Sequence, residues 1–129
     1  AKLIKQGDEA IIQRFVAEAR GTDIRIFVVG DEAVASMSRQ NHTGDFRSNL
    51  HHGGIGASIV PTEQEIDIAI RSAKSLGLQI CGVDIIRSDQ GPLVLEVNAV
   101  PGFKIEDVTG DNVAAKIIEH VELHANKTS

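Results

Sequence analysis

Two short runs of apolar and β-branched residues, joined by a turn, constrain the fold of this 129-residue chain more than any other stretch. Ile80 to Arg87 and Pro92 to Asn98 have the composition of strands, and the turn between them ends in a glycine that can adopt the left-handed conformation. We therefore predict an antiparallel hairpin. If Asp84 pairs with Glu96, the two-residue period of a strand brings Asp84, Glu96 and Asn98 to one face.

The same register sorts the apolar side chains of the hairpin onto the opposite face. The residues predicted there are Val83, Ile85, Leu93, Leu95 and Val97. A slip by one residue would destroy this sorting, and for that reason we prefer the register that pairs the two carboxylates.

Asp84, Glu96 and Asn98 offer two carboxylates and an amide oxygen, which are hard ligands suited to Mg²⁺. Because Mg²⁺ usually keeps water and substrate phosphates as its other ligands, a nucleoside triphosphate is the expected partner. Two other interpretations remain open. The carboxylates are also compatible with a solvated hairpin face, although the strands are rather apolar for one, or with an acid–base pair for glycoside hydrolysis, which the absence of Trp and Tyr disfavours.

Composition indicates a single globular domain and excludes several classes of function. The net charge of −5 argues against general affinity for DNA or RNA, and no apolar run approaches the ~20 residues that cross a bilayer. Cys81, the single cysteine, allows no internal disulfide, so we expect a reducing cytoplasm. The chain begins at Ala1 with a polar segment, which suggests a fragment of something longer.

The first forty residues read as a meander of antiparallel strands. The predicted strands are Glu9 to Ala17, Asp23 to Val29 and Glu32 to Arg39, and Gly30-Asp31 forms a two-residue hairpin turn between the last two. The chain then enters a long segment, residues 41–56, that is rich in Gly, His and Asn.

A loop of that length in a small domain is usually functional or disordered. Arg47, Ser48 and Asn49 supply hydrogen-bond donors, and the neighbouring glycines let backbone N–H groups approach an anion. The alternative is a mobile surface loop. His51 and His52 point apart and have no Cys partner at zinc spacing, so a zinc site has little support.

Two helices complete the prediction. Thr62 and Glu65 form a capping box before an apolar stripe that ends at Gly77, and a second helix runs from about Asp111 to Ala125. His120 and His124 lie one turn apart on it, a spacing that permits metal chelation but more often reflects a surface pair. We predict an α+β fold, an antiparallel sheet with two helices packed on one face.

Three ordered motifs carry a family resemblance over almost the whole chain. They read AEARGTDIRIFVVGDEAVASM, GDFRSNLHHGG and CGVDIIRSDQGPLVLEVNAVPG. Together they resemble the C-terminal half of an ATP-grasp ligase, closest to the RimK-type glutamate ligases. The resemblance implies that residues 1–129 form the C-terminal ATP-grasp subdomain, and that a lobe with the nucleotide-binding lysines and a further N-terminal domain precede residue 1.

The resemblance also implies a metal site and a nucleotide site. The metal ligands would be Asp84, Glu96 and Asn98, holding two Mg²⁺ or Mn²⁺ ions with Glu96 between them. ATP would be contacted by Arg14 and Phe15 at the adenine edge, by Asp23 near the ribose, and by Arg47, Ser48 and Asn49 at the phosphates. Of these, Arg47 and Asn49 would be catalytic.

The activity implied is ATP-dependent ligation of a carboxylate to the amine of glutamate through an acyl phosphate. The implied carboxylate substrate is the C-terminus of a ribosomal protein, with this fragment inactive alone and a homo-oligomer compatible with the family. Alternatives are an ATP-grasp ligase of the lysine-biosynthesis or glutathione type, and a nucleotide-binding module without catalysis. DNA and membranes are not expected partners.

Overall fold

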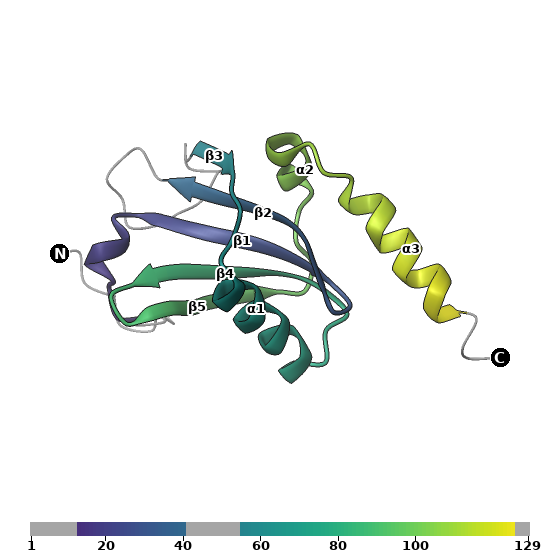
Figure 1. Ribbon diagram of the computed structural model, residues 1–129, viewed down its shortest axis with the longest axis horizontal. Helices are drawn as coiled ribbons and strands as arrows, with labels where there is room; N and C mark the ends of the chain where they lie inside the picture. The colour runs from purple at the N-terminus through teal and green to yellow at the C-terminus, as the bar shows by residue number, and fades with distance from the viewer. Residues whose placement is uncertain (1–12, 41–54, 126–129) are drawn as a thin grey trace, which may run out of the picture.

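The computed structural model describes residues 13–40 and 55–125, which form a five-stranded antiparallel sheet (Figure 1). The strand order is β3-β2-β1-β4-β5, with β5 at one edge. The bounds are β1 (Thr22–Val29), β2 (Glu32–Gln40), β3 (Ile55–Ser58), β4 (Ile80–Ser88) and β5 (Gly91–Asn98). The two later strands of the predicted meander and the central hairpin are thus confirmed, including the turn at Gly30, whose φ of +62° suits glycine.

The helical elements are η1 (Ala17–Ala19), α1 (Glu63–Ser75), α2 (Lys104–Thr109) and α3 (Val113–Ala125). The predicted capping box begins α1. Thr62 Oγ1 accepts a hydrogen bond from the Glu65 N–H at 3.1 Å, and the Thr62 N–H donates to Glu65 Oε2 at 2.9 Å. None of the helices in the described part of the chain is long and apolar enough to cross a bilayer.

The α+β class is confirmed, but the helices cover both faces of the sheet and not one. Alternate residues of β1 point to opposite faces, so Ile24, Ile26 and Val28 pack with Ala69 and Ala73 of α1. On the other face, residues of β1 and β2 pack with the first turns of α2 and α3; this second core contains Phe27, Val29, Ala35, Met37, Ile105 and Val113. In Figure 1 α2 and α3 accordingly lie apart from α1.

The hairpin register has the predicted pair and one unpredicted irregularity. Asp84 lies opposite Glu96, and Val83 lies opposite Val97. The register then shifts, so that Ile85 pairs with Val94 and leaves Leu95 as the extra residue of a β-bulge. Val94 consequently packs against the α1 core, whereas Leu93, which we placed on that core face, pairs with Ile86 and is 43% exposed.

Two further expectations need correction, and two elements were missed. The strand predicted over Glu9 to Ala17 is absent from its described part, because residues 13–16 have no regular structure and Ala17–Ala19 form a 3₁₀ turn. β3 and α2 were not predicted. Finally, α3 begins at Val113, and its outer half does not pack on the sheet, since Ile118 and Val121 are more than half exposed.

Candidate active site

The sheet face that carries α2 and α3 is divided along its strands into an apolar and a polar half. Phe27, Val29, Ala35 and Met37 occupy the half beneath the helices. Towards the other end, the same face of β1, β2 and β4 carries four charged side chains, Asp23, Arg25, Arg39 and Asp84, and we call these the charged cluster. Three of its members, Asp23, Arg39 and Asp84, are buried. Buried charges require partners, so their pairing defines the site.

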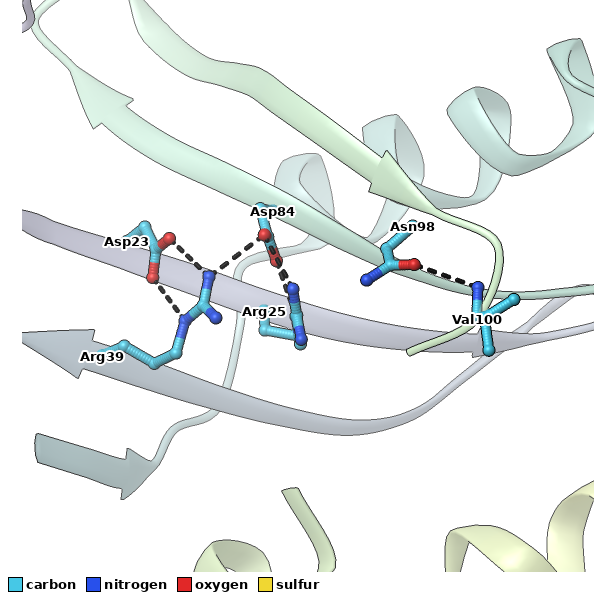
Figure 2. Close-up of polar contacts among 6 residues, drawn as sticks. All are labelled: Asp23, Arg25, Arg39, Asp84, Asn98 and Val100. Atoms are coloured by element: carbon cyan, nitrogen blue, oxygen red, sulfur yellow. Dashed lines mark hydrogen bonds and ion pairs between the residues drawn. The ribbon is translucent and has the colours of Figure 1, made fainter. Parts of the chain in front are cut away.

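Arg39 of β2 links the two carboxylates of the charged cluster (Figure 2). It lies opposite Asp23 in the β1–β2 register and donates to it through two bonds, Nε to Oδ1 at 2.8 Å and Nη2 to Oδ2 at 2.6 Å. The same Nη2 lies 3.1 Å from Oδ2 of Asp84. One planar guanidinium therefore spans β1, β2 and β4, a role that the point charge of a lysine could not fill.

Arg25 of β1 forms the second fork of the charged cluster. It lies opposite Asp84 and donates from Nε to Oδ1 at 2.7 Å and from Nη2 to Oδ2 at 2.9 Å. Both oxygens of Asp84 are thus bound to guanidinium groups in this structure (Figure 2). Among the described residues, every buried side-chain nitrogen and oxygen has a hydrogen-bond partner.

Burial and ion pairing have opposite effects on the pKa values of the charged cluster. Burial raises the pKa of the Asp23 carboxyl, and the opposing hydrogen bonds from Arg39 do not cancel this effect. Burial alone would lower the pKa of the Arg39 guanidinium, but Asp23 and Asp84 outweigh it and raise that pKa. Arg39 therefore keeps its positive charge at any physiological pH.

Glu96 and Asn98 lie beside the cluster on the edge strand β5. Glu96 is exposed and faces Asp84 across the hairpin, while Asn98 faces Gly82. Asn98 Oδ1 accepts a hydrogen bond from the Val100 N–H at 3.0 Å, which fixes the side chain as the chain turns away into Pro101. As predicted, Asp84, Glu96 and Asn98 come from one face of the hairpin.

The predicted metal ligands fit Mg²⁺ in donor chemistry and in register, because they present oxygen atoms from neighbouring strand positions. Within residues 13–40 and 55–125, no three His, Cys, Asp or Glu side chains gather as a metal site. The predicted set contains two carboxylates and one amide. The sequence did not indicate one feature of this set, namely that Asp84 is already bound by Arg25 and Arg39.

The residues predicted to contact the nucleotide fall into two described groups. Asp23 is part of the charged cluster. Arg14 and Phe15 lie just before η1, and both are exposed. Glu18 of η1 accepts a hydrogen bond from the Asp89 N–H at 3.2 Å, so this segment lies at the β4–β5 turn, the end of the sheet nearest Asp23.

The bulge adds an apolar surface to this same end. The two-residue period places Ile86 on the face of Asp84, and Ile86 pairs with Leu93. A regular hairpin would have turned Leu93 to the α1 core. The bulge thus gives the polar half of the face an apolar border.

Five residues of the predicted phosphate loop and its surroundings lie outside the described residues; they are Arg47, Ser48, Asn49, His51 and His52.

Sequence reasoning missed two members of the charged cluster, Arg25 and Arg39. A signal was present, because Asp23, Arg25 and Phe27 alternate with buried aliphatic residues. Charged residues on such a strand face are ordinarily solvated, and the pairing that buries them involves three different strands.

Comparison with solved structures identifies the class of fold. An ATP-grasp ligase, PsnB, solved with a phosphomimetic variant of its minimal precursor, Mg and ADP, superimposes with a TM-score of 0.65 at 21% identity, over 81% of this chain and 32% of that chain. The D-alanine–D-alanine ligase of Bacillus anthracis gives a TM-score of 0.58 at 18% identity, over 83% and 42%. The fold is therefore that of part of an ATP-grasp ligase.

The family follows from sequence comparison. The chain belongs to the RimK-like ATP-grasp domain family, whose model matches residues 2–121. A probable alpha-L-glutamate ligase of Xanthomonas euvesicatoria pv. vesicatoria is 54% identical over 120 residues, which are 92% of this chain and 41% of the relative. One from Stenotrophomonas maltophilia is 58% identical over 113 residues, 87% and 39%. The chain thus spans about two fifths of these relatives.

Proposed function

We propose that this chain is the C-terminal subdomain of an ATP- and Mg²⁺-dependent ligase that joins a carboxylate to the amine of glutamate. The observation that carries the proposal is the register that sets Asp84 opposite Glu96 beside the charged cluster, within a RimK-like ATP-grasp domain. The names of the relatives, probable alpha-L-glutamate ligases, support glutamate as the amine substrate.

Asp84, Glu96 and Asn98 would hold Mg²⁺ or Mn²⁺, with Glu96 shared between two ions. When bound, the metal would neutralise the phosphate oxygens and so favour transfer of the γ-phosphoryl group. The protein's own contribution is to hold these three oxygen donors on one rigid hairpin. The Asn98–Val100 hydrogen bond serves this purpose, because it fixes the amide orientation at the end of β5.

ATP would lie along the polar half of the face, with its base at the β4–β5 turn. The backbone at Arg14 and Phe15 would contact the adenine edge, and Asp23 would accept from the ribose. The Ile86–Leu93 pair offers an apolar surface for the base. Arg47, Ser48 and Asn49 would contact the phosphates, and Arg47 and Asn49 would hold the group in transfer.

The reaction would proceed in two transfers. A substrate carboxylate oxygen attacks the γ-phosphorus of ATP, the bond to the bridging oxygen breaks, and ADP leaves. The glutamate amine then attacks the acyl carbon, loses a proton, and expels phosphate to leave an amide. In the first step Arg47 would bind and orient the dispersed negative charge of the phosphoryl group, which is the main demand of phosphoryl transfer.

The finer features of the proposal rest on the family. RimK-like membership supports the C-terminus of a ribosomal protein as the carboxylate substrate. The chain alone would be inactive, because the nucleotide would require a second lobe preceding residue 1. A cytoplasmic location is compatible with Cys81, a buried free thiol.

The test compares Glu96→Gln with Glu119→Gln in the full-length protein. Glu119 is an exposed carboxylate on α3 and serves as the matched control. The measurement is glutamate-dependent ADP release at saturating Mg²⁺. We expect Glu96→Gln to slow ADP release by about a hundredfold or more, since several kcal/mol of charge stabilisation is lost. A wild-type rate in Glu96→Gln would refute the proposal, provided that Glu119→Gln also behaves as wild type.

A further inference from the structure

Asp84 is bound by two arginines that differ in how many other side chains they contact. Arg39 is fixed by the fork to Asp23 and touches Asp84 through a single nitrogen at 3.1 Å. Arg25 gives Asp84 the full fork, and the two hydrogen bonds that its guanidinium donates to the described residues both end on that carboxylate. If Asp84 is to bind another cation, Arg25 is therefore the arginine whose release leaves the rest of the network intact.

The surroundings of Arg25 also favour its release. Its side chain is 14% exposed, twice the 7% of Arg39. Its stem passes over Gly82, where Nε and Cδ lie 3.5 and 3.6 Å from the position that a Cβ would occupy. Gly82 lies opposite Asn98, so the stem of Arg25 runs between Asp84 and the strand position of Asn98. The guanidinium is thus bound to one predicted metal ligand, Asp84, and its stem lies beside the strand position of a second, Asn98.

Charge balance explains why both cations would not share Asp84. The charged cluster contains two carboxylates and two guanidinium groups and is formally neutral. A divalent cation entering a neutral, largely buried cluster would meet two positive charges at close range. With Arg25 withdrawn, the same ion would meet the two carboxylates of the cluster, Asp84 and Asp23, with only Arg39 opposing it.

We infer that Arg25 is a resident counter-cation for Asp84, and that a metal ion binds by displacing its guanidinium rather than by filling a preformed site. The inference rests on the proposed metal site. Arg39 acts as the positioning residue that keeps Asp84 in place during the exchange. The displaced guanidinium remains near the site, where it is available to the phosphates that accompany the metal.

The experiment measures binding of Mn²⁺ alone, without nucleotide, to the full-length protein by calorimetry or by the electron paramagnetic resonance of free Mn²⁺. The variants are Arg25→Gln and, as a matched control, Arg71→Gln. Arg71 pairs with Asp67 in an exposed i,i+4 ion pair on α1, away from the site. We expect Arg25→Gln to bind Mn²⁺ roughly ten- to a hundredfold tighter than wild type, since charge-assisted hydrogen bonds no longer oppose the ion. Arg71→Gln should match wild type.

Unchanged or weaker binding in Arg25→Gln would overturn the inference. If that variant does not fold, Arg25→Lys replaces it, because lysine keeps the charge but loses the fork and should bind Mn²⁺ with intermediate affinity. The double variant Arg25→Gln/Asp84→Asn should lose the gain, and retention of the gain would also count against the inference. Failure of the proposed function is recognised separately, as Mn²⁺–ATP binding to wild type that does not depend on Glu96.

Discussion

Arg39 and Asp23 face each other across β1 and β2 and share a buried two-bond ion pair at 2.6 and 2.8 Å. Removing the guanidinium leaves Asp23 and Asp84 buried without this partner. We expect Arg39→Met to lower the free energy of unfolding by about 3–5 kcal/mol, the usual cost of breaking a buried pair. Urea unfolding of the full-length protein measures the change.

The control for this prediction is Arg71→Met, which breaks an ion pair whose side chains are 70% and 62% exposed. Because exposed pairs contribute little, its effect should stay within about 0.5 kcal/mol. Equal losses in the two variants would show that the buried position of Arg39 gives its ion pair no special weight.

Glu65, at the start of α1, forms an ion pair with Arg87 at the end of β4. This ion pair should make the free energy of unfolding fall as the pH becomes acidic. Burial alone raises its pKa, but hydrogen bonds from Arg87 and from the Thr62 N–H outweigh burial and leave the pKa below its ordinary value. The unfolded chain therefore takes up the proton first as pH falls. The stability from this carboxylate is present above about pH 4.3 and is lost as pH falls through the lowered folded pKa.

Chemical denaturation between about pH 3 and pH 6 tests this dependence. Glu65→Gln should flatten the acid limb of the stability curve as well as lower its plateau. Glu63→Gln, a change at an exposed carboxylate in the same helical turn, should leave the limb in place. An acid limb of unchanged steepness in Glu65→Gln would assign the pH dependence to other carboxylates.

Two features favour glycine at position 30, namely its left-handed backbone conformation and the close approach of the His120 ring. Its φ is +62°, and a Cβ would lie 2.7 Å from Cε1 of the His120 ring. We expect Gly30→Ala to destabilise the protein by about 1–3 kcal/mol, from left-handed strain and from overpacking together. Gly77→Ala is the control, because Gly77 has a φ of +68° and nothing within 4 Å of the position that its Cβ would occupy.

The difference between the two alanine variants in thermal unfolding isolates the contact with His120. Truncation of that ring in Gly30→Ala/His120→Ala should recover part of the loss. If Gly30→Ala costs no more than Gly77→Ala, the imidazole moves aside freely and the close approach at the β1–β2 turn has no energetic weight.

Gly82 has a different requirement, which is purely one of space. Its φ is not in the left-handed region, but a Cβ would lie 3.1 Å from Cβ of Pro101 and 3.5 Å from Nε of Arg25. Gly82→Ala should therefore cost about 1–2 kcal/mol by crowding Pro101, since the contact with Arg25 is an ordinary van der Waals distance. Gly102→Ala, where nothing lies within 4 Å, should be close to neutral in the same unfolding assay. Equal stability of the two variants would mean that Pro101 relaxes without cost.

Much of the fold could be predicted because its signals are local. The Thr62–Glu65 capping box, the turn at Gly30 and the Asp84–Glu96 pair each depend on residues close in sequence or on a two-residue period. The bulge at Leu95 could not be predicted in this way. It is fixed by the burial of Val94 against α1, an element outside the hairpin. α2 was missed because six residues are too few to reveal a helical period.

The site was predictable in part for the same reason. Asp84, Glu96 and Asn98 lie on one hairpin, so their common face follows from register. Arg25 and Arg39 belong to other strands, and their pairing with Asp84 depends on the strand order β2-β1-β4, which no local pattern specifies. The positions of Arg47, Ser48 and Asn49 stay a prediction.

The division of one sheet face between a core and the charged cluster has a mechanical consequence. On β1, Arg25 and Phe27 are two residues apart, and on β2 so are Met37 and Arg39, so each strand is clamped by packing at one end and carries charge at the other. A strand is nearly inextensible along its length. A substitution of Ile105, the buried residue of α2 that packs on the apolar half, would therefore shift Asp23, Arg25 and Arg39 together. The distances among the three charged side chains would stay the same, while their distances to the β4–β5 hairpin would change.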